Sequence, residues 1–269
     1  MRQPRTSLLH GRPHRRARTP TELLAARFVA PYASFAEIYD FLIEAPALPL
    51  LQAALRRSAR QFRLNFRSLA DVGCGTGAFL ATLACRPISL TGIDRSASML
   101  AIARRRLAPC SVTLLQQDFR RLHLPNPVDL ITCHNQTINY LTLPEELVRM
   151  FSAIAHNLRQ GGALVFDFIA RARRSSRGHA ARILETIRLP DHDVRFEGEV
   201  DSARGRSTVR IDIATARAPV RRSVEVHRQR WFSPAMIRRC LRAAGLRLLC
   251  MRPIREADNH WLHVVAKRI

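Results

Sequence analysis

The chain has 269 residues, of which 47% are hydrophobic, and a formal net charge of +23. It is long enough for one large α/β domain with an insertion, and its hydrophobic content supports a full core. No apolar run approaches the roughly 18 residues of a membrane span, so we expect no membrane insertion. The six cysteines include no C-x-x-C pair and no zinc-type spacing with histidine. We therefore expect free thiols, no metal site and a reducing compartment, the cytoplasm.

The chain begins with a basic segment. Residues 1–20 contain six arginines, three prolines and no acid, which predicts a disordered tail, with a transit peptide as the alternative. A helical pattern begins at Thr21, and residues 49–62 form a second predicted helix that leads to the first strand. We therefore expect a helical cap in front of the core.

Short apolar runs then alternate with helical patterns. The predicted strands are 68–72, 88–93, 111–115, 128–133 and 162–168, and the predicted helices between them lie near 77–85, 96–107 and 144–159. This alternation predicts a doubly wound, mostly parallel sheet with helices on both faces. The site of such a sheet lies where the strand order reverses, here at the carboxyl ends of the first and fourth strands.

A glycine-rich turn follows the first predicted strand. Residues 69–77 read Leu-Ala-Asp-Val-Gly-Cys-Gly-Thr-Gly, and Asp94 ends the second strand 17 residues after Gly77. Glycines let the backbone approach a ligand closely, and the start of the next helix offers free N–H groups. Because a carboxylate at Asp94 can accept hydrogen bonds from both hydroxyls of a ribose, this unit predicts a ribonucleoside site.

Asp71 distinguishes between the possible nucleosides. Gly73, Gly75 and Ala78 also fit the dinucleotide pattern G-x-G-x-x-(G/A), but Asp71 would face the pyrophosphate. Two like charges about 4 Å apart cost roughly 4 kcal/mol at an effective dielectric constant near 20. A ligand with an ammonium and a sulfonium group would instead be attracted, and S-adenosylmethionine is such a ligand.

Four segments in this order resemble the motifs of class I S-adenosylmethionine-dependent methyltransferases: 71–77, 92–100, 117–119 and 128–135. The resemblance implies a seven-stranded, Rossmann-like methyltransferase fold with S-adenosyl-L-methionine as cofactor. The His-Asn-Gln-Thr sequence at 134–137 departs from the Asn-Pro-Pro-Tyr type of nucleic-acid amino-methyltransferases. Residues 35–40 resemble the Tyr-Asp helix with which many small-molecule methyltransferases cap the cofactor. The residues that the resemblance assigns to the cofactor are Tyr39, Asp71, Gly73, Gly75, Gly77, Asp94, Arg95, Met99, Asp118, Phe119 and His134.

The predicted core of residues 21–170 is followed by an insertion, residues 171–232. Within it, 171–189 are predicted to be an exposed connector, and the alternating runs 194–200, 208–213 and 224–231 predict an antiparallel β-insertion. The sequence from Glu225 to Pro234 is similar to the end of the β-insertion in amino-sugar N-methyltransferases, where such an insertion covers the acceptor pocket. Residues 233–269 are predicted to complete the core with a helix to Ala244 and a C-terminal β-hairpin.

The predicted reaction is methyl transfer to a small-molecule acceptor, at nitrogen rather than oxygen. It is an in-line displacement whose barrier is largely positional, so no covalent residue is expected. His134 after the fourth strand and His227 in the insertion are the candidate catalytic bases. Each has a structural alternative: His134 would shape its loop, and His227 would pair with Glu225 and Arg230.

The charge leaves other functions open. The chain has 44 basic and 21 acidic residues, and a surface of this kind attracts nucleic acid. The arginines are scattered, however, and no aromatic residues interleave with them as a stacking platform requires. We expect weak non-specific binding at most. An RNA or other nucleic-acid methyltransferase is the first alternative, and a non-catalytic nucleotide-binding interaction protein is the second. The sequence leaves the oligomeric state open.

Overall fold

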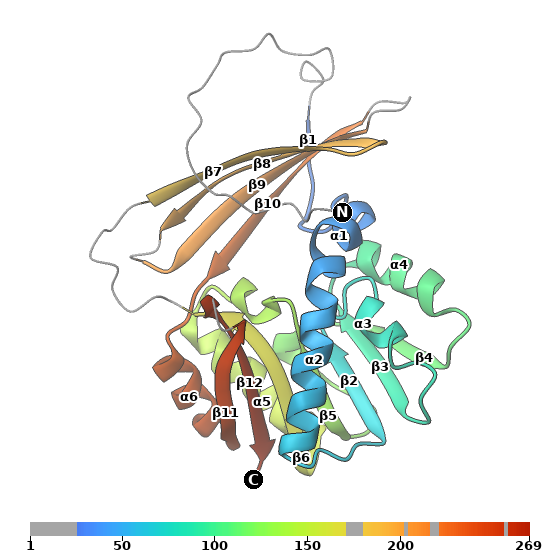
Figure 1. The fold of residues 1–269 in the computed structure, drawn as a ribbon, viewed down its shortest axis with the longest axis vertical. Coiled ribbons are helices and arrows are strands. Elements are labelled where there is room, and N and C mark those ends of the chain that lie inside the picture. Colours follow the sequence, from blue (N-terminus) through green and yellow to red (C-terminus); the bar gives the residue numbers. More distant parts are fainter. Residues whose placement is uncertain (1–25, 171–179, 202–203, 216–220, 256–257) are drawn as a thin grey trace.

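The computed structural model describes residues 26–170, 180–201, 204–215, 221–255 and 258–269. In these residues, a seven-stranded sheet flanked by helices forms the core, and a separate five-stranded sheet lies beyond one end of it (Figure 1). The predicted tail at 1–20 and the first part of the predicted connector, 171–179, lie outside the described residues.

The core sheet has the strand order β11-β12-β6-β5-β2-β3-β4. Its strands are β2 (Ser68–Val72), β3 (Ser89–Asp94), β4 (Val112–Gln116), β5 (Val128–Cys133), β6 (Leu158–Ile169), β11 (Leu246–Arg255) and β12 (Asp258–Arg268). β2 to β6 pair in parallel, whereas β12 is antiparallel to both β6 and β11. The predicted fold class is confirmed. Because the order reverses between β2 and β5, the loops after these two strands meet at one edge.

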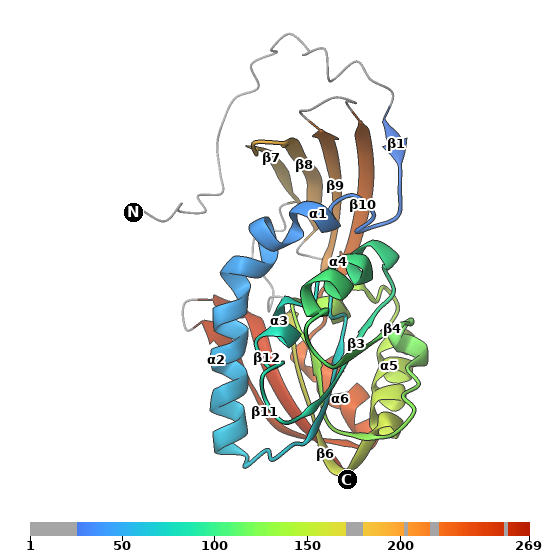
Figure 2. The ribbon, with the colours of Figure 1, turned by 90° about the vertical axis from the view of Figure 1, so that its right-hand side faces the viewer.

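Helices cover both faces of the core sheet (Figure 2). One face carries α2 (Ala45–Gln61), α3 (Ala78–Ala81) and α4 (Ala97–Leu107), and the other carries α5 (Pro144–Asn157) and α6 (Pro234–Ala243). Ser96 and Ser233 begin α4 and α6, because each side chain accepts a hydrogen bond from the backbone N–H three residues later. Each face has its own hydrophobic cluster, so the sheet is buried on both sides.

The cap in front of the core starts later than predicted. The helical pattern placed at Thr21 is wrong over Arg27–Phe28, which form the short strand β1, and the helix begins only with α1 (Ala36–Tyr39). A left-handed backbone at Tyr32, with φ of 64°, separates the strand from the helix. α1 continues without a break through the π-helical turn η2 (Asp40–Glu44) into α2.

This continuous helix, Ala36–Gln61, is long and apolar enough to cross a membrane by length and composition alone. The sequence analysis did not anticipate such a segment. In the fold, Leu51 and Leu55 on this helix are buried, and Leu55 belongs to the hydrophobic cluster on that face of the sheet. A helix that packs one apolar face on the core of a globular protein shows the same burial.

The small sheet has the order β1-β10-β9-β8-β7. Its longer strands are β7 (Ala180–Arg188), β8 (His192–Asp201), β9 (Arg206–Thr215) and β10 (Arg222–Arg230), all antiparallel, and β1 adds a two-residue parallel edge. The predicted β-insertion is therefore present, but the exposed connector over 171–189 is wrong for β7. As an edge strand, β7 leaves Leu184 66% exposed, and so it lacks the apolar alternation that identified its neighbours.

The small sheet is attached to the core at the carboxyl ends of the parallel strands (Figures 1 and 2). Phe35 and Ile38 next to and within α1 share a buried cluster with Val194, Ile211 and Ile213 of the small sheet. The same cluster includes Met99 of α4. The small sheet and the N-terminal helix therefore close over the edge at which the loops after β2 and β5 meet.

Candidate active site

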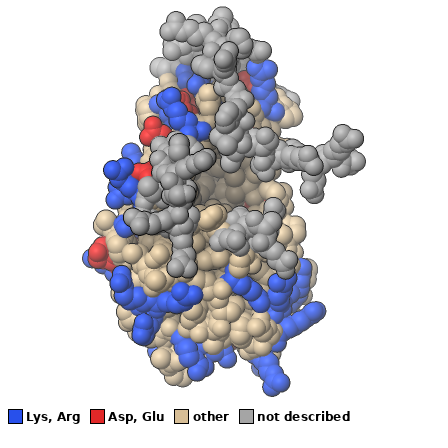
Figure 3. Space-filling model, turned by 60° about the vertical axis from the view of Figure 1, so that its left-hand side comes forward, with Lys and Arg blue, Asp and Glu red and all other residues tan. Residues whose placement is uncertain are grey.

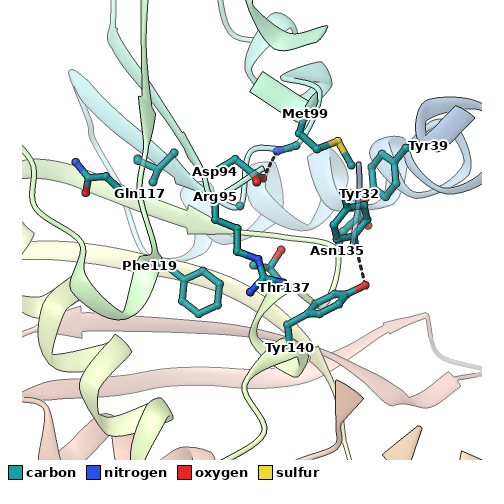
Figure 4. A pocket seen from close by; sticks show the side chains of 13 residues that line it. Tyr32, Tyr39, Asp94, Arg95, Met99, Gln117, Phe119, Asn135, Thr137 and Tyr140 are labelled. Carbon is teal, nitrogen blue, oxygen red and sulfur yellow. Dashed lines mark hydrogen bonds between the residues drawn. The ribbon is translucent and has the colours of Figure 1, made fainter. Parts of the chain in front are cut away.

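A pocket of about 570 Å³ lies at this edge (Figure 4). It is formed by the loops after the first three parallel strands and after β5, together with the N-terminal segment. Its lining residues are Tyr32, Tyr39, Gly73, Gly75, Ile93, Asp94, Arg95, Met99, Gln117, Phe119, Asn135, Thr137 and Tyr140.

The glycine loop forms one wall of the pocket because its backbone has conformations that favour glycine. Gly73, Gly75 and Gly77 all have positive φ, at 73°, 54° and 74°. A Cβ atom on Gly73 would lie 2.5 Å from Thr137, whereas one on Gly77 would lie 2.9 Å from Leu107 of α4. Gly73 therefore allows the loops after β2 and β5 to meet, and Gly77 allows α3 to pack on α4.

Asp94 ends β3 with its carboxylate in the pocket. The oxygens accept hydrogen bonds from the backbone N–H groups of Gly75, at 3.0 Å, and Ser96, at 2.8 Å. Burial raises the pKa of Asp94, although these hydrogen bonds work in the opposite direction. The carboxylate is thus fixed against the glycine loop at the wall of the pocket.

A second network fixes the helical cap on the glycine loop. Asp40 of η2 accepts a hydrogen bond from the Thr76 hydroxyl and forms an ion pair with Arg106 of α4. Arg106 also donates to the Thr76 carbonyl at 2.9 Å. The cap, the loop and α4 are therefore joined at one point, which places Tyr39 at the pocket wall.

Three carboxylates, Glu44, Asp71 and Asp167, form a buried acidic cluster behind Asn135. Glu44 accepts a hydrogen bond from the Asn135 amide at 2.5 Å, and Asp167 accepts one from the Asn135 backbone at 3.0 Å. Burial raises the pKa of Glu44 to about 7 and that of Asp71 to about 6. Within the part of the chain that the structure describes, no lysine or arginine forms an ion pair with these carboxylates. Glu44 and Asp71 therefore hold their protons more tightly than they would in water.

His134 is the basic member of this region. Its Nδ1 lies 3.4 Å from Asp167 and its ring packs on Phe79. Its Nε2 is buried and has no hydrogen-bond partner among the residues that the structure describes. Burial opposes protonation, but the hydrogen bond and charge of Asp167, with the charges of Asp71 and Glu44, outweigh it and raise the pKa of His134. The histidine partly balances the acidic cluster.

Aromatic and polar side chains form the opposite end of the pocket. The hydroxyls of Tyr32 and Tyr140 are 2.5 Å apart, and Tyr140 lies 2.7 Å from Nδ1 of His227. Nε2 of His227 lies 3.0 Å from Glu225. Because Glu225 is fully buried and also binds backbone N–H groups of the N-terminal segment, this network joins β10 to the pocket.

The structure brings together seven of the predicted site residues. The ones that line the pocket are Tyr39, Gly73, Gly75, Asp94, Arg95, Met99 and Phe119. Asp71, Gly77 and the two candidate bases, His134 and His227, are not among the residues that line it. Each histidine is only 5% exposed, and the ring of His227 lies against that of Tyr140, which does line the pocket.

Asp118 is also not placed in the pocket. Its two oxygens accept hydrogen bonds from Nε of Arg120, at 2.9 and 3.0 Å, and Arg120 also binds Glu146 of α5. These contacts lower the pKa of Asp118. The residue that lines the pocket here is its neighbour Gln117, so the predicted contact of Asp118 with adenine has no support in the geometry.

Sequence reasoning missed Thr137 and Tyr140. A compositional signal was present: the chain has three tyrosines, and all three line this pocket. Tyrosine combines an apolar ring with a polar end, which suits a half-buried binding site.

Comparisons with known proteins agree with this geometry. A family model described as a methyltransferase domain matches residues 69–162, which contain the glycine loop and β2 to β5. A putative methyltransferase from Geobacillus sp. (strain WCH70) is 34% identical over 139 residues, which cover 51% of this chain and 56% of the relative. The chain thus spans little more than half the length of that relative.

Longer matches exist. A dTDP-3-amino-3,6-dideoxy-alpha-D-glucopyranose N,N-dimethyltransferase from Streptomyces fradiae is 30% identical over 218 residues, which cover 78% of this chain and 83% of the relative. The solved structure of a sugar N-methyltransferase from Streptoalloteichus sp. has a TM-score of 0.69 and 27% identity, and covers 86% of this chain and 92% of that one. Together with the glycine loop, Asp94 and the strand order, these matches show that the chain belongs to the family of S-adenosylmethionine-dependent methyltransferases.

Proposed function

We propose that this protein transfers the methyl group of S-adenosyl-L-methionine to the amino nitrogen of a small molecule, with an amino sugar as the first candidate. One observation carries the proposal. A single pocket extends from the ribose-type carboxylate Asp94 to the hydroxyls of Tyr32 and Tyr140 beside the small sheet. Cofactor and acceptor would therefore meet in one cavity, with their reacting atoms in line.

The cofactor would occupy the end of the pocket next to the glycine loop. Asp94 would accept hydrogen bonds from the ribose hydroxyls, and Met99 and Phe119 would contact the adenine. The acidic cluster supports this fit, because Glu44 and Asp71 would attract a ligand that carries an ammonium and a sulfonium group. A dinucleotide with two phosphate charges would be repelled by the same groups.

The acceptor would lie between the cofactor and the tyrosines, under the small sheet. Its nitrogen lone pair would attack the methyl carbon while the carbon–sulfur bond breaks. Positioning of this kind can supply about 7–11 kcal/mol of the barrier. A neutral amine needs only a group that removes a proton, so no metal or covalent residue is required. His134 is only 5% exposed and does not line the pocket, and we assign it the electrostatic role of balancing the acidic cluster instead of contact with the acceptor.

Two observations support the amine. The Streptomyces fradiae relative is named for N,N-dimethylation of a dTDP-amino sugar, and the Streptoalloteichus structure is that of a sugar N-methyltransferase. Both resemble this chain over more than three quarters of its length. The second support is the set of hydrogen-bonding side chains at the acceptor end, which would bind an N–H group.

Methylation of a nucleic acid is the second candidate, and the net charge of +23 favours it. The basic residues on the face shown in Figure 3 are scattered over its upper and lower parts and form no single stripe. The small sheet also restricts access for a folded RNA. We therefore propose weak, salt-sensitive binding of nucleic acid as the only consequence of this charge.

The proposal places the protein in the cytoplasm. All six cysteines lie in the described residues and none is in a disulfide, which is typical of a reducing compartment. The acceptor would be a small molecule.

The test is a methylation assay with the full chain, labelled S-adenosylmethionine and two acceptors, dTDP-3-amino-3,6-dideoxyglucose and total tRNA. Mass spectrometry should detect one or two methyl groups on the sugar nitrogen and none on the RNA. A small panel of other primary amines and of matched alcohols separates nitrogen from oxygen acceptors. Methylation of RNA alone, or of alcohols alone, would overturn the proposal.

A further inference from the structure

A hydrogen-bonded chain leads from the pocket to a fully buried carboxylate. Tyr32 and Tyr140 line the pocket, and their hydroxyls are 2.5 Å apart (Figure 4). The Tyr140 hydroxyl lies 2.7 Å from Nδ1 of His227, and Nε2 of that ring lies 3.0 Å from Glu225. Four side chains from three distant segments therefore make one continuous path away from the acceptor end of the pocket.

The contacts of Glu225 fix the direction of this path. Its oxygens accept hydrogen bonds from the backbone N–H groups of Tyr32, Ser34 and Phe35, at 2.6, 2.6 and 2.8 Å. Burial raises the pKa of Glu225, but the hydrogen bond from His227 and those from the backbone outweigh it, so the pKa is lowered and the group is an anion. An anion can only accept, so Nε2 of His227 carries the proton that it shares with Glu225.

The remaining protons follow from this assignment. In the neutral ring that carries its proton on Nε2, Nδ1 of His227 accepts the hydroxyl proton of Tyr140. The Tyr140 oxygen in turn accepts from the Tyr32 hydroxyl. Every donor in the chain thus points away from the pocket and toward Glu225, which is the arrangement needed to draw a proton inward.

We propose that Tyr140 is a catalytic residue that takes the proton from the acceptor nitrogen and passes its own proton to His227, with Glu225 as a positioning residue. This inference rests on the proposed function and names the groups that complete it. As the nitrogen lone pair bonds to the methyl carbon, the electron pair of the breaking carbon–sulfur bond stays on sulfur, and positive charge develops on the nitrogen, which still carries its proton. That proton moves to the Tyr140 oxygen as the Tyr140 proton moves to Nδ1 of His227. The products are a neutral methylated amine, neutral tyrosine and an imidazolium paired with Glu225.

The environment of Tyr140 explains why a relay is needed. Burial raises the pKa of Tyr140 to about 12, so a lone phenolate would not form at neutral pH. Passing a proton through the hydroxyl avoids the phenolate, because one proton arrives as the other leaves. The imidazolium loses its proton to water after the product departs. A second methylation of the same nitrogen would use the same path.

The groups that face this relay come from each element packed around it. Glu225 lies on the strand of His227, Tyr140 comes from the 3-10 turn η4 (Thr137–Tyr140), and Tyr32 comes from the segment after β1. Arg95 faces Tyr140 from the loop after β3 and favours its ionised form. The pH dependence of the reaction therefore reports on these groups together.

The test compares wild type, Tyr140→Phe and His227→Gln in methylation of the dTDP-amino sugar between pH 6 and 9. We expect kcat at pH 7 to fall about a hundredfold in Tyr140→Phe and at least tenfold in His227→Gln, in line with general-base catalysis. KM and the Kd for S-adenosylhomocysteine should stay within about threefold, which also shows that each variant is folded. The deficit of Tyr140→Phe should shrink as pH rises, because solvent then removes the proton.

A matched control is His192→Gln on the same small sheet. His192 also lies near a glutamate, with Nε2 3.7 Å from Glu37, but it is outside the relay and the pocket, so its kcat and pH profile should equal those of wild type. A Tyr140→Phe variant with kcat within twofold of wild type, or with an unchanged pH profile, would overturn the relay. The same result in His227→Gln would overturn it even if Tyr140→Phe failed to fold. Failure of wild type to methylate any amine would instead overturn the proposed function, and the relay with it.

Discussion

The two ends of the pocket are built in different ways. The end at the glycine loop comes mainly from one stretch of about 30 residues, Leu69–Met99, in which Gly73, Gly75 and the Asp94 carboxylate line the cavity. The tyrosine end is assembled from Tyr32, Tyr140 and β10, and the hydrogen bond from Tyr32 to Glu225 joins residues 193 positions apart. The first end is a local structure that strand and turn geometry dictate, and the second depends on how two sheets meet.

This difference separates binding from chemistry. Backbone groups in the glycine loop are fixed by φ angles that side chains do not change, so that end is suited to a constant ligand, the cofactor. At the other end, single side-chain replacements alter both the hydrogen bonding and the shape. The acceptor identity would then be determined by the tyrosine end, and the following predictions are designed to break or refine this division.

The largest expected effect is on stability, because Glu225 holds the N-terminal segment onto β10. Glu225→Ala should lower the free energy of unfolding by about 3–5 kcal/mol, since it leaves three backbone N–H groups and His227 without their buried acceptor. Glu225→Gln keeps one acceptor oxygen, so it should lower the free energy of unfolding by less than Glu225→Ala does. Chemical denaturation measures both. A loss below about 1 kcal/mol in the alanine variant would mean that the tyrosine end does not depend on this distant contact.

In the acidic cluster we expect a smaller change in the free energy of unfolding, and here the substitution should stabilise the protein. Because burial raises the pKa of Glu44 to about 7, the folded state binds its proton more tightly than the unfolded state. The stability from this group is present below pH 4.5 and is lost as pH rises through 7. Glu44→Gln removes the penalty and should stabilise the cofactor-free protein by about 2 kcal/mol at pH 8, but not at pH 4.

The measurement is denaturant unfolding of Glu44→Gln and wild type at both pH values. The same substitution should weaken binding of S-adenosylmethionine more than that of S-adenosylhomocysteine, which lacks the sulfonium charge. If Glu44→Gln destabilises the protein at pH 8, then the negative charge of Glu44 does not destabilise the cofactor-free fold, and a cationic ligand would have no such repulsion to offset.

The smallest effect is expected at Asp118. Its carboxylate is held by Arg120 and does not line the pocket, so Asp118→Ala should change the Kd for S-adenosylhomocysteine less than twofold. Its ion pair is one-third exposed and should contribute less than about 1 kcal/mol to stability. A tenfold loss of affinity would instead indicate that Asp118 contacts the cofactor, as the family resemblance implies.

The contrast between the two ends also explains what the sequence predicts and what it does not. The strands β2 to β5 and the glycine loop follow from short apolar runs, turn residues and spacing, so their bounds differ from the predictions by one residue at most. Asp94 was found for the same reason. β7 was missed because an edge strand buries little, and Tyr140 was missed because its partners are distant in sequence. His227 was found as a candidate, but only the fold shows that Tyr140 stands between it and the pocket.

The most direct test of the account is a pair of calorimetric titrations with S-adenosylhomocysteine, one on Asp94→Ala and one on Tyr140→Phe. The account predicts that Asp94→Ala loses about 1.5–3 kcal/mol, or roughly ten- to 150-fold in affinity, because a buried carboxylate no longer binds the ribose. Tyr140→Phe should stay within about threefold of wild type. Equal losses in the two variants, or unchanged affinity in Asp94→Ala, would contradict the division of the pocket into a cofactor end and an acceptor end.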